Sequence, residues 1–107
     1  MNKYRAIKTT IDGMTFDSKA EAKRWHELRM LERAGHIERL ERQVKFPLVV
    51  DGVPIATYRA DFVYWSTSPV ARVVEDVKSE PTAKKRDFVI IRKLMRAIHK
   101  TDIQVIM

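Results

Sequence analysis

The sequence predicts one domain of the α/β (α+β) class, in which two helices flank a mixed sheet made of an antiparallel meander and one parallel crossover strand. Two Asp-Gly pairs, Asp12-Gly13 and Asp51-Gly52, lie between runs rich in β-branched and aromatic residues, which is the pattern of a β-hairpin. Two segments, 18–34 and 83–100, instead repeat apolar residues at helical spacing. An apolar segment after the second helix then predicts the crossover strand.

The chain begins with a predicted hairpin. Lys3 to Thr10 has the composition of a short strand, Asp12-Gly13 supplies the turn, and Met14 to Phe16 is expected to pair back on the strand. Ser18 follows, with Glu21 three residues later, which fits a helix capping box. The first helix is therefore expected to begin at Ser18.

This helix is expected to run from Ser18 to Ala34. Trp25, Leu28 and Leu31 recur at helical spacing among charged residues, so one face of the helix is apolar. Gly35 is expected to end the helix, because glycine readily adopts the left-handed conformation that follows a C-terminal turn.

Three strands are predicted in the middle of the chain. Ile37 to Val50 is strand-like and interrupted or bent near Pro47, and Val53 to Trp65 returns beside it after the second Asp-Gly turn. Ser66 to Pro69 has the composition of a loop, and Val70 to Lys78 is the third strand. These three strands form the antiparallel meander.

The C-terminal part is predicted to be a helix followed by a strand. Thr82 is the expected N-cap of a helix from Ala83 to Lys100. Its apolar stripe comprises Phe88, Ile91, Met95 and Ile98. Asp102 to Met107 is a short apolar strand, which is expected to lie parallel to the strand from Val70 to Lys78.

The composition indicates a folded, basic protein. The 107 residues are enough for a single compact domain, 1–107, with 45% apolar and 33% charged residues. Because 21 Lys and Arg stand against 14 Asp and Glu, the formal net charge is +7. Such an excess attracts polyanions through counterion release, so nucleic acid is the expected partner.

Several classes of site are excluded by the composition. The chain has no cysteine, which excludes disulfides, thiolate catalysis and cysteine-ligated zinc. No apolar run approaches the ~20 residues that span a bilayer, and no N-terminal run resembles a signal peptide. A cytoplasmic protein without membrane contact is therefore expected.

Two acids and a lysine lie on two predicted neighbouring strands. Asp61 is on the second strand of the meander, and Asp76 and Lys78 end the third. Because side chains alternate along a strand, Asp76 and Lys78 are expected to face the same way, with Val77 on the opposite face. Two carboxylates suit Mg²⁺ or Mn²⁺, and a neighbouring ammonium suits an attacking water or a phosphate oxygen.

Within this order of elements, Asp61 followed by Asp76-Val77-Lys78 resembles the PD-(D/E)xK nuclease superfamily. The chain is similar in particular to small phage-encoded members, among them Holliday junction resolvase-like enzymes. Two further motifs carry this likeness: a Phe-Asp-Ser-Lys-x-Glu-Ala helix start at Phe16 to Ala22, and a Tyr-x-x-Asp-Phe strand at Tyr58 to Phe62. The resemblance covers most of the chain and implies a restriction-endonuclease-like core.

Two positions bear on this match. Ala60 occupies the place of the motif proline, which weakens only the sequence signal. Glu75 directly precedes Asp76 and leaves a register ambiguity, although Asp76-Val77-Lys78 has the spacing that the motif requires.

The resemblance implies Mg²⁺-dependent cleavage of DNA. Asp61 and Asp76 would ligate Mg²⁺, for which Mn²⁺ substitutes, together with the backbone carbonyl of Val77 and water. Lys78 would position or deprotonate the attacking water and stabilise the charged transition state. Glu21 would add a ligand directly or through water, or would bind a second ion.

The acids and the lysine also have structural interpretations. Glu21 can be only the N3 partner in the capping box, although its spacing from the apolar stripe turns it toward the same face of the helix. Asp61 can be an exposed strand residue paired with Arg59 or Arg72. Asp76 and Lys78 can be an ion pair on a solvated edge.

Further polar residues are candidates for contact with the substrate. Lys84, Lys85 and Arg86 follow directly on the strand that carries Asp76, so they are expected to track the DNA backbone, with a solvated charged face as the alternative. Gln43 can orient a phosphate or a ligand near the site, or can be an ordinary surface glutamine.

The expected function is that of a DNA endonuclease, either structure-selective like a junction resolvase or nicking. A junction has two-fold related strands, so a resolvase is expected to act as a homodimer, whereas a monomer favours nicking. The alternative is a basic nucleic-acid-binding module that makes no Mg²⁺-dependent product. A helix-based DNA reader is disfavoured, because neither predicted helix is followed by a short turn and a second helix.

Overall fold

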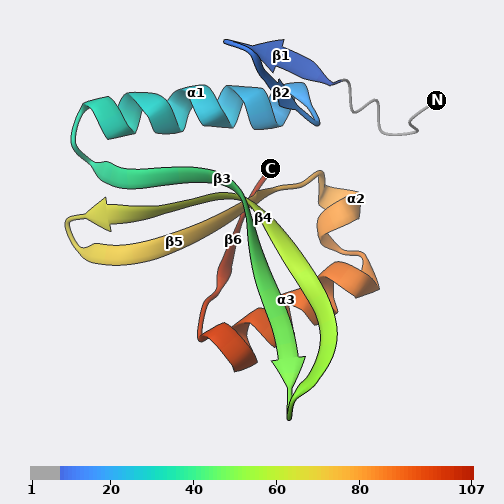
Figure 1. Cartoon of the computed structure of the whole chain (residues 1–107). Helices are drawn as coiled ribbons and strands as arrows, with labels where there is room; N and C mark the ends of the chain where they lie inside the picture. Colours follow the sequence, from blue (N-terminus) through green and yellow to red (C-terminus); the bar gives the residue numbers. More distant parts are fainter. Residues whose placement is uncertain (1–7) are drawn as a thin grey trace.

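The computed structural model of the chain describes residues 8–107 (Figure 1). The elements follow in the order β1 (Thr9–Ile11), β2 (Met14–Phe16), α1 (Lys19–Arg33), β3 (Ile37–Val50), β4 (Val53–Thr67), β5 (Val70–Val77), α2 (Glu80–Ala83), α3 (Arg86–His99) and β6 (Ile103–Ile106). None of the helices within these residues is long and apolar enough to cross a membrane.

The main sheet is mixed, as the sequence predicts. Its strand order is β3-β4-β5-β6, in which β3, β4 and β5 pair antiparallel and β6 pairs parallel to β5. The backbone N–H of Lys78 donates to the carbonyl of Ile106 at 2.9 Å, so the β5–β6 ladder continues one residue past the end of β5. β1 and β2 form a separate small sheet.

Both Asp-Gly pairs make the predicted hairpin turns. Asp12 and Gly13 have φ angles of 51° and 77°, and Asp51 and Gly52 have φ angles of 50° and 78°. Two consecutive residues with positive φ are the requirement of the type I′ turn, which Asp-Gly meets at low cost. The part of the predicted first strand that precedes residue 8 lies outside the described residues.

Helix α1 begins and ends at the predicted signals. The backbone N–H of Glu21 donates to the Ser18 side-chain oxygen at 3.1 Å, which is the N-cap bond. Gly35 follows the C-cap with φ of 81°. The apolar stripe is shorter than predicted, because Leu28 is buried but Leu31 is 36% exposed.

Two hydrophobic clusters lie on opposite faces of the main sheet. The cluster under α1 contains Phe16, Ala22, Leu28, Ile37, Phe62 and Tyr64. The cluster under α3 contains Phe46, Leu48, Tyr58, Ala60, Val63, Val74, Phe88, Met95 and Ile103. The predicted stripe of the second helix supplies the α3 side of this cluster, with Ile91 and Ile98 packed against it. The sheet is therefore covered on both faces, by α1 and by α3 (Figure 1).

The strands differ from the prediction in two places. Pro47 pairs with Thr57 without interrupting β3, although a register shift lies close to it, between Leu48 and Val49, and a second lies between Glu38 and Glu41. β4 also continues to Thr67, beyond the predicted end at Trp65. The reason is that β3 and β5 both pair with this end: Ser66 pairs with Ile37 and Thr67 with Val70. Long-range pairing thus overrides the loop-like composition.

The second helix is also different from the prediction, because it is divided into α2 and α3. Thr82 lies inside α2 and is not an N-cap, and the N-cap position of α3 is Lys85, which makes no side-chain cap bond. Pro81 is tolerated in the first turn of a helix, which allows α2 to begin before the predicted start. The consecutive cations at 84–86 are unfavourable beside the positive N-terminal end of a helix dipole. The helix is interrupted at this point, between α2 and α3.

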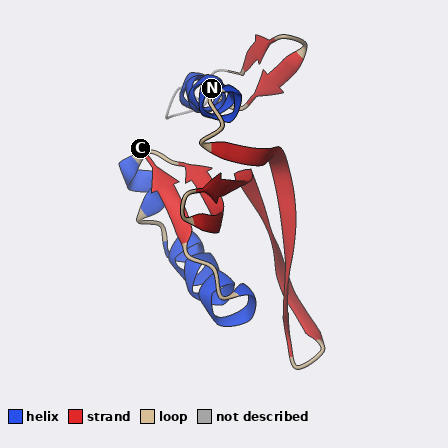
Figure 2. Cartoon of the chain, turned by 90° about the vertical axis from the view of Figure 1, so that its left-hand side faces the viewer, coloured by secondary structure: helices blue, strands red, loops and turns tan. Residues whose placement is uncertain are grey.

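The paired ends of β3 and β4 project from the body of the molecule as a two-stranded arm (Figure 2). The arm, defined here as residues 47–56, exposes Val49, Val50, Val53 and Ile55 and contains one charged residue, Asp51. Its base runs into the part of β3 and β4 that carries the candidate site.

Candidate functional site

The site begins at an irregularity in β3. Gln43 has φ of 55°, which is rare for a residue with a side chain, and it lies between the pairs Arg42–Phe62 and Val44–Ala60. Gln43 is therefore opposite the position of Asp61 in β4, although the two do not form a regular strand pair. Conformations of this kind cost about 1–3 kcal/mol and persist where the surrounding structure holds them.

Asp76 is held by two donors. Its Oδ1 lies 3.1 Å from the Lys78 ammonium, and its Oδ2 accepts a hydrogen bond of 2.7 Å from the Tyr58 hydroxyl. The prediction that Asp76 and Lys78 share a face is confirmed. Because Asp76 is only 2% exposed, the interpretation of these residues as an ion pair on a solvated edge is wrong.

Asp61 lies beside Asp76 on the neighbouring strand. Its Oδ2 accepts a 2.8 Å hydrogen bond from the backbone N–H of Val77. Neither predicted structural partner binds it, since Arg59 is 3.8 Å from Asp17 and Arg72 lies over the Phe46 ring. Burial, followed by the negative charge of Asp76, raises the pKa of Asp61 from 3.8 to about 8, although the Val77 bond opposes this rise.

Glu21 reaches the same region from the first turn of α1. It is 3% exposed, and its Oε1 accepts a 3.0 Å hydrogen bond from the Gln43 side-chain amide. Burial has the largest effect on Glu21 and raises its pKa, and the negative charges of Asp17 and Asp76 raise this pKa further. The positive charge of Arg42 acts in the opposite direction and lowers it. Glu21 is thus more than the N3 residue of a capping box, because its carboxylate points into the protein.

The three carboxylates form one electrostatic cluster. Asp76 raises the pKa of both Glu21 and Asp61, so α1, β4 and β5 bring their acids together. Lys78 is the cation in ion-pair contact with this cluster, among the residues that the structure describes. When all three carboxyl groups are ionised, the cluster therefore has an excess of negative charge.

The donor atoms of the cluster fit a hard divalent cation, although they are not arranged as a finished metal centre. Within residues 8–107, no three acidic or histidine side chains converge in a metal-coordinating geometry. The Oε1 atom of Gln43 is nevertheless buried without a hydrogen-bond partner, beside the Glu21 carboxylate. A buried acceptor without a donor can be satisfied by a cation or by water.

Glu75 lies on the opposite face of β5 from Asp76. Its two carboxylate oxygens accept hydrogen bonds of 2.8 and 2.7 Å from the Arg24 guanidinium, and one of them also accepts from the Tyr64 hydroxyl. The hydrogen bond to Glu75 raises the pKa of Arg24. The register ambiguity is resolved by this arrangement, since Asp76 faces the site and Glu75 ties α1 to the sheet.

Tyr58 is a site residue for which the sequence predicts only core or sheet packing. Burial and the charge of Asp76 raise its pKa, so the hydroxyl stays protonated and keeps donating to Asp76. The Tyr-x-x-Asp-Phe motif contains this residue, but its contact with β5 depends on the strand register. The contact between Tyr58 and Asp76 could therefore be predicted only if the pairing between the strands were known.

The predicted DNA-contacting cations lie at the junction of the last two helices. Lys84 and Lys85 connect α2 to α3, Arg86 begins α3, and all three are exposed. Phe88, in the first turn of α3, lies closer to the acids, and the centre of its ring is 4.9 Å from the Lys78 ammonium. The start of α3 thus packs beside the site, and a DNA contact by Lys84, Lys85 and Arg86 stays a prediction.

Asp61 is expected to make the metal-free protein less stable as the pH rises. Its pKa is raised in the folded state, so between about pH 4 and pH 8 the folded state holds a proton that the unfolded state has lost. The stabilisation from Asp61 is therefore complete below pH 4 and is lost as the pH rises through 8. In EDTA, Asp61→Asn is expected to raise the Tm by several degrees at pH 8 and to flatten its pH dependence, as measured by thermal denaturation. Asp102→Asn, an exposed control, should follow the native protein; equal slopes for all three proteins would contradict the assignment.

A model of the family described as "Protein of unknown function (DUF1064)" matches residues 1–105. No curated protein and no solved structure matches the chain. The match spans nearly the whole chain, so every residue of the cluster lies within it.

Proposed function

Because this chain belongs to the DUF1064 family, whose description states no activity, we propose a function from the site itself: Mg²⁺-dependent hydrolysis of phosphodiester bonds in DNA. One observation carries the proposal. Three carboxylates from α1, β4 and β5 gather in a largely buried cluster, where Lys78 forms an ion pair with one of them. Such a cluster is costly for stability, which favours a role in chemistry.

A divalent cation would be held by Asp61 and Asp76, with the Val77 backbone carbonyl and Glu21 as further ligands. One oxygen of Asp76 already forms an ion pair with Lys78 and the other accepts a hydrogen bond from Tyr58, but a carboxylate oxygen has lone pairs for a second partner. The raised pKa of Asp61 indicates that this carboxyl lacks a compensating positive charge. Mg²⁺, or Mn²⁺ in its place, would polarise the phosphodiester and lower the pKa of a bound water.

The remaining polar groups would orient the reactants. Lys78, fixed by Asp76, would hold the attacking water and stabilise the negative charge that develops on the phosphate oxygens as the new oxygen–phosphorus bond forms and the bond to the leaving sugar oxygen breaks. Tyr58 would keep the Asp76 carboxylate in one rotamer. Gln43 would direct its free Oε1 acceptor toward water or a ligand, while its amide fixes Glu21.

The proposed substrate is DNA in a branched form or a strand to be nicked. The net charge of +7 favours a polyanion, and Lys84, Lys85 and Arg86 would contact phosphates next to the site. Resolution of a four-way junction requires two related cuts, so that activity would involve a homodimer. A monomer would favour nicking.

The alternative function is DNA binding without catalysis. It is favoured by the satisfied state of Asp76, whose two oxygens are held by Lys78 and Tyr58, as in a structural network. This alternative predicts DNA binding that does not depend on the acids.

The first test incubates the purified protein with supercoiled plasmid and with an end-labelled four-way junction, in Mg²⁺, in Mn²⁺ and in EDTA. We expect cutting in either metal and none in EDTA, because two carboxylates cannot activate water for phosphodiester hydrolysis without a metal. Gel electrophoresis measures the product. Binding without any cut product in either metal would support the DNA-binding module.

A further inference from the structure

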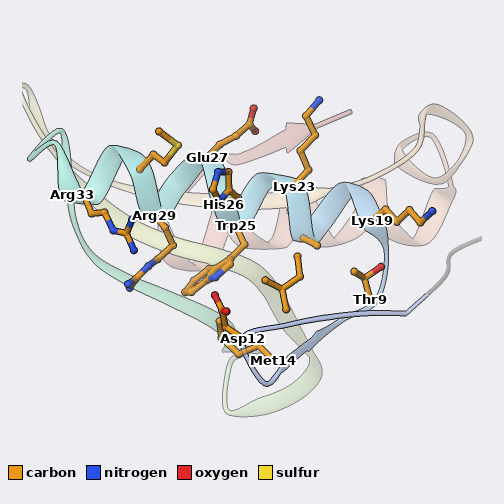
Figure 3. Close-up of a pocket in the computed structure, with 13 residues that line it drawn as sticks. Thr9, Asp12, Met14, Lys19, Lys23, Trp25, His26, Glu27, Arg29 and Arg33 are labelled. Carbon is orange, nitrogen blue, oxygen red and sulfur yellow. The ribbon is translucent and has the colours of Figure 1, made fainter.

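A groove of about 830 Å³ lies between the β1–β2 hairpin and α1, apart from the carboxylate cluster. Figure 3 shows Trp25 projecting from α1 toward Asp12 and Met14 of the hairpin. The wall also includes Ala22, which directly follows the site residue Glu21. The groove and the candidate site therefore share the first turns of α1.

The floor of the groove is apolar and held in place. Ile11, Met14, Trp25 and Met30 line it, and Met30 is 57% exposed. Trp25 stacks on Phe62, the neighbour of Asp61, with the ring centres 6.1 Å apart. A fixed aromatic edge beside exposed apolar side chains is a surface on which flat rings can pack.

Four cations of α1 are among the residues that line the groove: Lys19, Lys23, Arg29 and Arg33. Figure 3 shows Lys23 projecting from the side of the helix that faces away from the hairpin. With a rise of about 1.5 Å per residue, successive cations are roughly 6 to 9 Å apart along the axis. Within the part of the chain that the structure describes, Lys19, Lys23 and Arg33 make no ion pair. The acids on the wall are Asp12 and Glu27, and Glu27 is 3.4 Å from Arg24.

We propose that this groove binds a single strand of nucleic acid, with bases on the apolar floor and phosphates on the cations. The inference rests on the proposed nuclease function and deepens it. A duplex presents phosphates but hides the faces of its bases, so only an unpaired strand complements both the cations and the floor. The preferred substrate would then be DNA with a single-stranded arm next to the scissile bond.

The test measures binding of a fluorescein-labelled oligothymidine by anisotropy, in EDTA so that no cleavage intervenes. Lys23→Ala/Arg33→Ala is compared with Lys93→Ala/Arg96→Ala, which removes the same charge from a second basic surface on α3. We expect the groove variant to bind about tenfold more weakly. The slope of log affinity against log salt should fall by about 1.4, since each lost phosphate contact on a single strand contributes about 0.7. The α3 variant should change affinity less than about twofold.

Trp25 provides a second readout. In a Trp65→Phe background Trp25 is the remaining tryptophan, and its emission should be quenched on titration with oligothymidine but not with a duplex of equal length. Equal weakening by the two double variants, or unchanged Trp25 emission, would overturn the proposal. The proposal would also be overturned if the protein forms a dimer in solution that the Met30→Asp substitution dissociates. A second copy of the chain, and not a nucleic acid, would then occupy the groove.

Failure of the groove and failure of the nuclease function are distinguishable. If plasmid is cut in Mg²⁺ while the two double variants bind oligothymidine alike, the proposed nuclease function is supported and the proposed strand-binding groove is refuted. If oligothymidine binding is specific for the groove but no DNA is cut, the strand-binding site stands without the chemistry.

Discussion

Asp76→Asn is expected to reduce the proposed Mg²⁺-dependent cleavage of plasmid by roughly a thousandfold or more, because it removes the charge of a proposed metal ligand and the ion-pair partner of Lys78. The change keeps the shape of the side chain and its bond from Tyr58, so the fold should persist. Initial rates of nicking in Mg²⁺ measure the effect, and anisotropy with a labelled duplex shows whether DNA is still bound.

The matched control is Glu75→Gln, the same change from carboxylate to amide one residue earlier. Glu75 contacts Arg24 and Tyr64 on the other face of β5, so the variant should lose stability but keep most of its activity at 25 °C. If Asp76→Asn cuts DNA as fast as the native protein, Asp76 is not a ligand. Equal losses in the two variants would indicate a general effect on the fold.

Arg24→Met is expected to destabilise the protein by about 3–5 kcal/mol, since it leaves the buried Glu75 carboxylate without its cation. For a domain of this size, such a loss lowers the Tm by about 15 °C. Thermal denaturation followed by circular dichroism measures the change. The large effect follows from burial, because Glu75 is only 1% exposed.

Arg29→Met is the control on the same helix. Arg29 is also bonded to an acid three residues later, Glu32 at 3.2 Å, but this pair is solvated, and its loss should move the Tm by no more than about 2 °C. Arg24→Leu/Glu75→Leu should recover much of the loss, because neither charge is then left unpaired. A loss for Arg24→Met no larger than for Arg29→Met would contradict the role of the buried pair.

Local signals sufficed for most of the fold. The Asp-Gly turns, the Ser18 cap and the apolar stripe of α3 each act within a few residues, so the sequence displays them directly. The same holds for Asp76 and Lys78, because alternation along one strand places both on one face. The spacing between Glu21 and Leu28 likewise predicts that both side chains lie on the inward face of α1.

What the sequence did not display depends on contacts between distant segments. The contact of Tyr58 with Asp76 follows from how β4 lies beside β5, and the inward Gln43 follows from an irregular conformation in β3. The extension of β4 to Thr67 and the pairing of Glu75 with Arg24 likewise depend on tertiary structure. Propensity does not contain this information, because these groups become neighbours only when the sheet forms.

The positions of Glu75 and Asp76 on opposite faces of β5 make this chain unequally tolerant of insertions and deletions. One residue added or removed between Thr67 and Val70 would exchange the two carboxylates between faces, since side chains alternate along the strand. Arg24 would lose its buried partner Glu75, and the site would lose the Asp76 carboxylate, through the same change in length. At the tip of the arm, Asp51-Gly52 turns in solvent, and a change of length there leaves both carboxylates in place. The length of the β4–β5 connection is therefore fixed both by the fold and by the candidate site, whereas the tip of the β3–β4 arm tolerates a change in length.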